Sequence, residues 1–319
     1  MRRMISILGA GLVGRGWAIA FARAGYQVRL YDVVESALTS ASNEIQSNVE
    51  SLAASGLLTA SQGAELVNRI VTTNVLGDAL HGAAYVQECV AERLSVKQEL
   101  MRQVSRDLPA NAIVASSTSA LLPSQLYKDV DFNDRCLVCH PVNPPYLIPF
   151  VEVVPSPWTK EEVVVEAMRL MKEIGQTPIL LRKEIAGFVL NRLQVALVNE
   201  AISLVRSGVA SVEEVDLAVK DGLAYRWAFM GPFETIDLNA PEGIRDYLTR
   251  FTDMYKIAGE SICESPFSDE LLTTLERERR ALLPAKSMEL RREWRDKKIM
   301  SHRQQYKLGP DVSDIEPEN

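Results

Sequence analysis

The residues best suited to chemistry in this sequence are His140 and Glu152, which flank a proline-rich segment. A histidine whose second ring nitrogen meets a carboxylate has a fixed tautomer and can accept a proton during a reaction. Apolar runs at 136–139 and 150–154 predict two strands, and the prolines between them exclude a helix. The chain must turn back there, which brings His140 towards Glu152. A lone histidine at a strand end is more often structural, so this interpretation depends on what surrounds the pair.

A glycine-rich turn near the N-terminus predicts a phosphate-binding loop. A buried strand is followed at once by Gly9, Gly11 and Gly14, and then by an amphipathic helix. Gly9 permits the tight turn, Gly11 lets a pyrophosphate approach the backbone, and Gly14 lets the helix and the strand pack closely. A second strand ends at Asp32, where a carboxylate can bind both ribose hydroxyls. Because no arginine follows Asp32 to meet a 2′-phosphate, we predict NAD and not NADP.

Two further polar residues, Ser119 and Asn191, are candidates for contact with a substrate. Ser119 follows a predicted strand at 112–118, and ligands of parallel sheets bind beyond the carboxyl ends of the strands. A run of serines is normally a solvated loop. Asn191 begins a long apolar helix, where an asparagine is most often a satisfied buried amide. At the rim of an active site, both side chains can hydrogen-bond a substrate oxygen.

The alternation of strands and helices must position these residues. It predicts an α/β fold with a parallel sheet, a Rossmann-type dinucleotide-binding domain, up to residue 185. From Gly187 onwards the pattern is helical, and the long helix from 187 to 208 is apolar enough to be buried between helices or in a subunit interface. We therefore predict an NAD-binding domain at 1–185, an all-α substrate and dimerisation domain at 186–308, and a disordered acidic tail at 309–319.

Composition excludes several classes of function. The formal net charge is −7, which argues against a nucleic-acid partner, and no apolar run is long enough to cross a bilayer. The N-terminus lacks the features of a signal peptide, so we expect a cytoplasmic protein. Cys136 and Cys139 have CxxC spacing, but residues three apart in a strand point to opposite faces. We predict no metal site, and we predict reduced, buried thiols.

Taken in order, the motifs resemble the 3-hydroxyacyl-CoA dehydrogenase superfamily. They are GAGLVG, Asp32, ECVAERLSVKQEL, SSTSAL, HPVNPPYLIPFVEVV and GFVLNRL. HPVNPPYLIPFVE and GLAYRWAFMGPFET are more similar to its lambda-crystallin branch, which includes L-gulonate 3-dehydrogenases. The resemblance implies a dinucleotide-binding domain followed by a helical domain that forms a homodimer.

The resemblance also implies roles for individual residues. His140 matches the general base and Glu152 its partner, while Ser119 and Asn191 match the residues that contact the substrate. The residues that match NAD contacts, besides the three glycines, are Leu12, Val13, Asp32, Glu92 and Lys97.

The substrate remains open among L-gulonate, L-carnitine, 3-hydroxybutyrate and a CoA ester. The CoA-dependent members are expected to carry lysines after the second strand, but this chain has no lysine between Asp32 and Lys97. We therefore favour a free hydroxy acid, whose carboxylate Arg226 would bind, with Arg192 as a second candidate. A surface or interface role for Arg226 is the alternative. A non-catalytic, crystallin-like structural protein that binds NAD is a hypothesis of another class.

Overall fold

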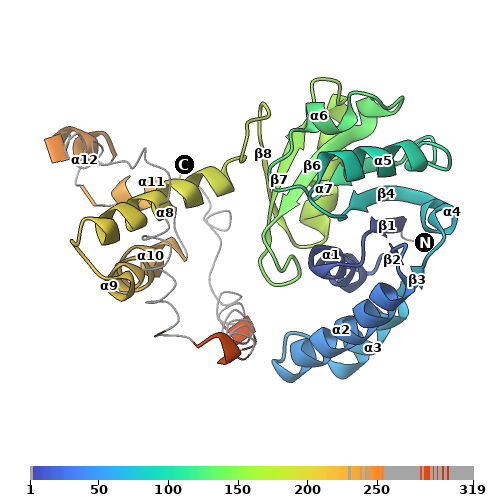
Figure 1. Ribbon diagram of the computed structural model, residues 1–319, viewed down its shortest axis with the longest axis horizontal. Coiled ribbons are helices and arrows are strands. Elements are labelled where there is room, and N and C mark those ends of the chain that lie inside the picture. The colour runs from blue at the N-terminus through green and yellow to red at the C-terminus, as the bar shows by residue number, and fades with distance from the viewer. Residues whose placement is uncertain are drawn as a thin grey trace, which may run out of the picture. The chain divides into compact units, whose positions relative to one another are not determined.

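The structure, a computed structural model, describes residues 3–228, 231–237, 239–240, 244–251, 253–254, 281, 284–287, 290, 293, 297 and 300–301 (Figure 1). The chain divides into two compact units. The first comprises Met1–Val189 together with Arg292–Asn319, and the second comprises Leu190–Arg291.

An eight-stranded sheet forms the centre of the first unit, in the order β3-β2-β1-β4-β5-β6-β7-β8 (Figure 1). Neighbouring strands are parallel, except that β7 runs antiparallel to β6. The strand order reverses between β1 and β4, which is where an open α/β sheet binds its ligand. The strands are β1 (Met4–Leu8), β2 (Gln27–Tyr31), β3 (Ile70–Thr73), β4 (Ala83–Glu88), β5 (Ile113–Ser116), β6 (Cys136–Pro141), β7 (Phe150–Pro155) and β8 (Thr177–Leu180).

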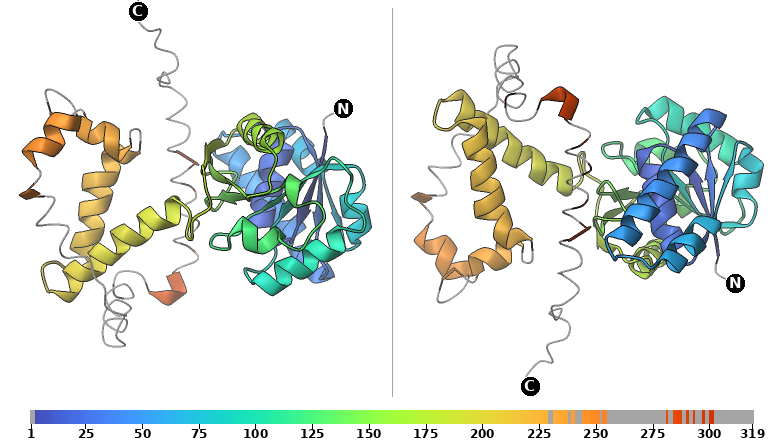
Figure 2. Two further views of the ribbon diagram at one scale, coloured as in Figure 1. Left: turned by 90° about the horizontal axis from the view of Figure 1, so that it is seen from above. Right: turned by 90° about the horizontal axis from the view of Figure 1, so that it is seen from below.

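Helices cover both faces of this sheet, as Figure 2 shows from above and below. Helices α1, α2, α3 and α7 contribute to one apolar core, and α4, α5 and α6 contribute to the other. Cys139 belongs to the first core and Cys136 to the second, so the two thiols lie on opposite faces, as predicted. The helices are α1 (Leu12–Arg23), α2 (Glu35–Ala54), α3 (Ala60–Asn68), α4 (Leu76–Leu80), α5 (Leu94–Val104), α6 (Pro123–Tyr127), η1 (Asn133–Arg135) and α7 (Glu161–Glu173).

The buried side of α1 anchors both the glycine turn and the proline-rich return. Trp17 and Phe21 are fully buried against the sheet, with ring centroids 5.6 Å apart. Gly16 faces the return, and a β-carbon at this position would lie 2.5 Å from Cδ of Pro145. The segment between β6 and β7 can approach α1 this closely only because position 16 has no side chain.

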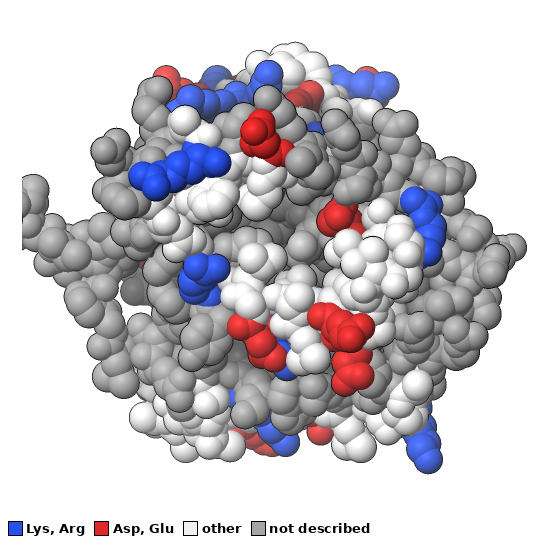
Figure 3. Space-filling view, turned by 90° about the vertical axis from the view of Figure 1, so that its left-hand side faces the viewer, with Lys and Arg blue, Asp and Glu red and all other residues white. Residues whose placement is uncertain are grey.

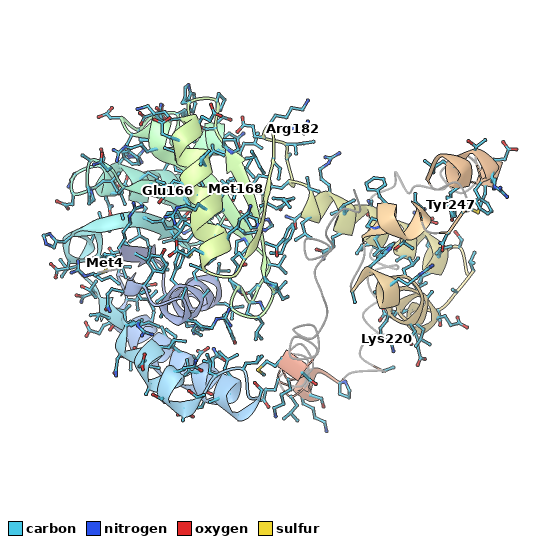
Figure 4. The ribbon with its side chains drawn as sticks, turned by 180° about the vertical axis from the view of Figure 1, so that it is seen from behind. Met4, Glu166, Met168, Arg182, Lys220 and Tyr247 are labelled. Carbon is cyan, nitrogen blue, oxygen red and sulfur yellow. The ribbon has the colours of Figure 1, made fainter. Side chains whose placement is uncertain are left out.

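The second unit contains short helices after one long helix. Ser211 and Glu214 form a capping box at the start of α9. Figure 4 labels Lys220 in η2 and Tyr247 in α12, and Figure 3 shows one face of the molecule on which acidic and basic side chains are interspersed. The described elements are α8 (Leu190–Arg206), α9 (Val212–Leu217), η2 (Ala218–Leu223), α10 (Ala224–Trp227), α11 (Pro232–Asp237), α12 (Ile244–Arg250) and η3 (Ala285–Ser287).

The predicted fold class is confirmed, with differences in detail. β3 and α4 were not predicted, and α8 begins at Leu190 and not at Gly187. The apolar side chains of α8 are exposed, as at Leu193 and Val195, or half-buried, so burial of this helix between helices of the same chain is not seen. The domain boundaries and the interface alternative for α8 stay predictions, and residues 309–319 lie outside the described residues. In the part of the chain that is described, no helix is long and apolar enough to cross a membrane.

Candidate active site

His140 and Glu152 are in direct contact at the carboxyl edge of the sheet. They are register partners in the antiparallel pair of β6 and β7, and His140 Nδ1 lies 2.7 Å from Glu152 Oε2. Glu152 is fully buried and His140 nearly so. When Nδ1 donates its proton to this carboxylate, Nε2 is the ring nitrogen with a lone pair for accepting another proton. The strand–return–strand geometry inferred from the prolines therefore produces the predicted pair.

The glycine turn has the three properties that a phosphate-binding loop requires. Gly9 has a φ of 110° and lies so close to β4 that a β-carbon would be 2.7 Å from the Cys89 carbonyl oxygen. A β-carbon at Gly14 would be 1.9 Å from the Gly9 carbonyl oxygen, so this glycine allows α1 to meet β1. Apart from the chain immediately around it, no atom of the described residues lies within 4 Å of a β-carbon placed on Gly11. The backbone at Gly11, ahead of the free amides of α1, is therefore open to a pyrophosphate.

Asp32 is held firmly beside this loop. Its Oδ2 accepts the backbone N–H of Ala10 at 2.9 Å, and its Oδ1 accepts that of Val34 at 3.0 Å. A cavity of about 570 Å³ adjoins it, lined by the glycine loop, the end of β2, the segment after β4 and one side of α5, with Val90, Val96 and Leu100 among its apolar residues. A carboxylate at the edge of an apolar cavity, next to an open phosphate loop, fits the adenosine half of a dinucleotide.

Lys97 has a partner that the sequence analysis did not identify, Glu88 at the end of β4. Its Nζ lies 2.8 Å from Glu88 Oε1 and 3.0 Å from Oε2, and both side chains are almost inaccessible to solvent. Ser116 and the backbone N–H of Val90 also donate to the Glu88 carboxylate. Burial raises the pKa of Glu88, and the nearby Lys97 ammonium opposes that rise. The ECVAE segment contains the signal, an acidic residue at the carboxyl end of a predicted strand.

Glu92 connects Lys97 to the loop that carries Ser119. Its Oε2 is 3.3 Å from Lys97 Nζ, and its Oε1 accepts hydrogen bonds from the Thr118 hydroxyl and from the Ser119 backbone N–H at 2.9 Å. Partial burial raises the pKa of Glu92, but the bonds from Thr118, Lys97 and Ser119 outweigh it, so the net shift is downward. Glu92 therefore acts in the structure as an anionic anchor for the serine loop.

The remaining predicted substrate residues belong to the second unit. Asn191 is the second residue of α8 and is half-buried, and Arg192 follows it with an exposed side chain. Arg226 lies in the four-residue helix α10 and is also exposed. Their predicted roles stay predictions, as do the roles of Leu12 and Val13 at the start of α1.

The cysteines near the site are not poised for nucleophilic chemistry. Burial raises the pKa of Cys89 to about 12, and it raises the pKa of Cys139 to about 12 as well. In the described part of the chain these thiols and that of Cys136 form no disulfide. Cys136 and Cys139 are buried, as predicted, whereas Cys89 is half-buried. A thiol with so high a pKa stays protonated at neutral pH. Cys263 lies outside that part.

Both halves of the chain match one family. Residues 4–185 match the NAD binding domain of 3-hydroxyacyl-CoA dehydrogenase, and residues 187–277 match its C-terminal domain. The solved structure of a 5-formyl-3-hydroxy-2-methylpyridine 4-carboxylic acid 5-dehydrogenase, an NAD⁺-dependent dismutase, is similar with a TM-score of 0.82 and 28% identity. The alignment covers 97% of this chain and 100% of that one.

Two relatives with known names indicate which branch of this family the chain resembles most. Lambda-crystallin of Oryctolagus cuniculus is 41% identical over 296 residues, which is 92% of each chain. An L-carnitine dehydrogenase of Pseudomonas syringae pv. syringae is 34% identical over 272 residues, 85% of this chain and 84% of that one. The motifs, the fold and these relatives agree. The chain belongs to the lambda-crystallin branch of the 3-hydroxyacyl-CoA dehydrogenase family, NAD-dependent dehydrogenases that act on CH–OH groups, and NAD is its cofactor.

Proposed function

We propose that this protein oxidises a free 3-hydroxy acid to the 3-keto acid with NAD, and that L-gulonate is its first candidate substrate. The observation that carries the proposal is the 2.7 Å contact between His140 Nδ1 and Glu152 Oε2. It lies at the carboxyl edge of a sheet whose switch point bears the glycine loop. A base at this edge can work beside a dinucleotide bound at the loop.

The chemistry assigns each residue one task. NAD, when bound, supplies the acceptor for the hydride that leaves the alcohol carbon. His140 Nε2 takes the hydroxyl proton in the same reaction, and Glu152 orients the ring and stabilises the imidazolium that forms. Ser119 and Asn191 donate hydrogen bonds to the substrate oxygen as it becomes a carbonyl. The reaction balances, because the alcohol loses one hydride to NAD and one proton to His140 and becomes a neutral carbonyl group.

The charge on α2 and α3 supports a free acid over a CoA ester. Residues 35–68 contain four glutamates and neither lysine nor arginine. Arg15, which faces this region, already pairs with Glu44 at 2.7 Å. CoA carries several phosphates, which an acidic pair of helices repels. A free hydroxy acid carries no phosphate and needs a single cation for its carboxylate. Arg226 or Arg192 would provide that cation.

A substrate panel tests the proposal. NADH absorbance would be followed with L-gulonate, L-carnitine, 3-hydroxybutyrate and 3-hydroxybutyryl-CoA. We expect a free acid to exceed the CoA ester in kcat/KM by about a hundredfold or more. Equal or better saturation kinetics with the CoA ester would reject the free-acid proposal. His140→Gln, measured with the best substrate, should lose nearly all turnover while it still binds NAD, and full activity in that variant would reject His140 as the base.

A structural role is the candidate of another class, and the relationship to lambda-crystallin favours it. A protein that serves by packing alone does not require the His140–Glu152 contact at the carboxyl edge of the sheet. The same panel separates the two functions. Binding of NAD without turnover of any hydroxy acid would favour the structural role.

A further inference from the structure

The turn at 186–189, which ends the first unit, touches both members of the proposed catalytic pair. Phe188 is fully buried, and its ring centroid lies 5.5 Å from that of the His140 imidazole, with the rings inclined by 47°. The next residue, Val189, donates its backbone N–H to Glu152 Oε1 at 2.8 Å. The other carboxylate oxygen, Oε2, is the one that meets His140. Two consecutive residues of one turn therefore contact the histidine and the glutamate.

The backbone of this turn adopts an unfavourable conformation. Gly187 has a φ of 75° and Phe188 a φ of 49°. In the described part of the chain, Phe188 is the one residue other than glycine with a positive φ. The left-handed region is costly for a bulky side chain, and such strain persists where surrounding contacts compensate for it. The Phe188 N–H, which donates to the Ile185 carbonyl at 3.0 Å, is one of these contacts.

We infer that Gly187, Phe188 and Val189 form a clamp that fixes the imidazole and the carboxylate in the orientation needed for proton transfer. Phe188 and Val189 are then positioning residues. An imidazole bonded only through Nδ1 can still swing about its side-chain torsions, and the Phe188 ring limits that motion. A carboxylate bonded only through Oε2 can rotate about its last torsion, and the Val189 N–H on Oε1 limits that rotation. This inference deepens the proposed function and rests on it.

A simpler reading makes Phe188 an ordinary core residue, since it also belongs to the core on the α5 face of the sheet. The two readings differ in one measurable respect. A core residue changes stability when it is shortened, whereas a clamp also changes the tautomer and mobility of the His140 ring. The chain has only three histidines, so the His140 ring nitrogens can be followed separately.

The test uses the full chain labelled with ¹⁵N in its histidine rings, with the His140 signals assigned by their absence in His140→Gln. In the unaltered protein we expect His140 to hold one tautomer, with the proton on Nδ1. Phe188→Leu and Gly187→Ala should show averaged tautomers and a kcat lowered about tenfold to a hundredfold, with KM for NAD unchanged. Phe188→Tyr, which keeps an aromatic ring, should restore the single tautomer.

Gly175→Ala is the matched control for backbone strain. Gly175 has a φ of 81°, close to that of Gly187, and a β-carbon there meets no atom of another described residue within 4 Å, its chain neighbours aside. It should lose stability as Gly187→Ala does, but keep the His140 signals and kcat. A single tautomer and normal kcat in Phe188→Leu and Gly187→Ala would overturn the clamp, as would averaged tautomers in the unaltered protein. No turnover of any hydroxy acid by the unaltered protein would instead reject the proposed function, and the ring signals would still decide the clamp.

Discussion

Lys97 Nζ lies 2.8 Å from Glu88 Oε1 in an ion pair that solvent barely reaches. This pair is linked to the loop that carries Ser119, because Glu92 contacts both Lys97 and that loop. Moving two charges from water into the protein interior costs free energy, and the attraction between the two charges offsets that cost. We therefore expect the loss of either charge to lower the stability of the first unit and to disturb the loop that carries Ser119.

Lys97→Met should destabilise the protein by about 3–5 kcal/mol at pH 7, because it leaves the Glu88 carboxylate buried without its counter-charge. Burial raises the pKa of Glu88, so the folded variant binds a proton more readily than the unfolded chain does. Its stability should therefore rise as the pH falls from 7 towards the ordinary glutamate value of about 4.3. Urea denaturation at several pH values measures this change. In the double variant Lys97→Met/Glu88→Gln, stability should partly recover and lose this pH dependence, and a loss no smaller than in Lys97→Met alone would contradict the argument.

Gly11→Ala and Gly14→Ala should separate cofactor binding from folding. A β-carbon at Gly11 meets no atom of the described residues within 4 Å apart from its chain neighbours, so stability should change by less than about 1 kcal/mol. The methyl group would occupy space that the pyrophosphate needs, and Kd for NAD should rise by about tenfold or more. At Gly14 the β-carbon would overlap the Gly9 carbonyl oxygen, so stability itself should fall by about 1–3 kcal/mol. Titration calorimetry and thermal unfolding check both variants, and unchanged NAD affinity in Gly11→Ala would exclude this loop as the phosphate site.

The sequence sufficed for those parts of the site that depend on local pattern. The glycine spacing and the end of β2 at Asp32 place the phosphate loop, and the prolines between β6 and β7 bring His140 to Glu152. These features are predictable because each involves a turn whose geometry depends on glycine or proline.

The supporting contacts were not predictable from local pattern. Glu88 meets Lys97 because a strand end and a helix face come together in space, and no periodicity records that pairing. No local pattern distinguishes Gly16 from the other small residues of α1, although it is the residue that allows Pro145 to approach. The helical pattern from Gly187 onwards predicts that Phe188 lies in a helix, whereas the structure gives it a left-handed backbone. Residue propensity carries no information about backbone strain that other contacts compensate.

Glu152→Gln should lower kcat by about a hundredfold to ten-thousandfold with little change in stability. The amide has nearly the shape of the carboxylate, but it can donate to Nδ1 and so favour the tautomer that has its proton on Nε2. That tautomer cannot accept the substrate proton, and a neutral amide does not stabilise an imidazolium. Glu166→Gln is the control, since Glu166 lies on α7 and pairs with Arg3 and Arg169 (Figure 4). If both variants kept the unaltered kcat with the best substrate, Glu152 would have no role in the reaction.

Arg226→Ala should raise KM for the hydroxy acid by about 10- to 100-fold and leave KM for NAD unchanged. A charge-assisted hydrogen bond to a carboxylate is worth about 1.5–3 kcal/mol, which corresponds to that range. Arg192→Ala is measured beside it, because Arg192 is the second candidate for this role and both arginines are exposed. Lys220→Ala provides the control, since Lys220 lies in η2, immediately before α10, and pairs with Asp221 at 3.0 Å (Figure 4). An arginine whose removal raises KM for the acid alone is the anchor, whereas equal effects on both substrates would indicate a structural role. If neither arginine changed KM for the acid, its carboxylate would have to be bound by another group.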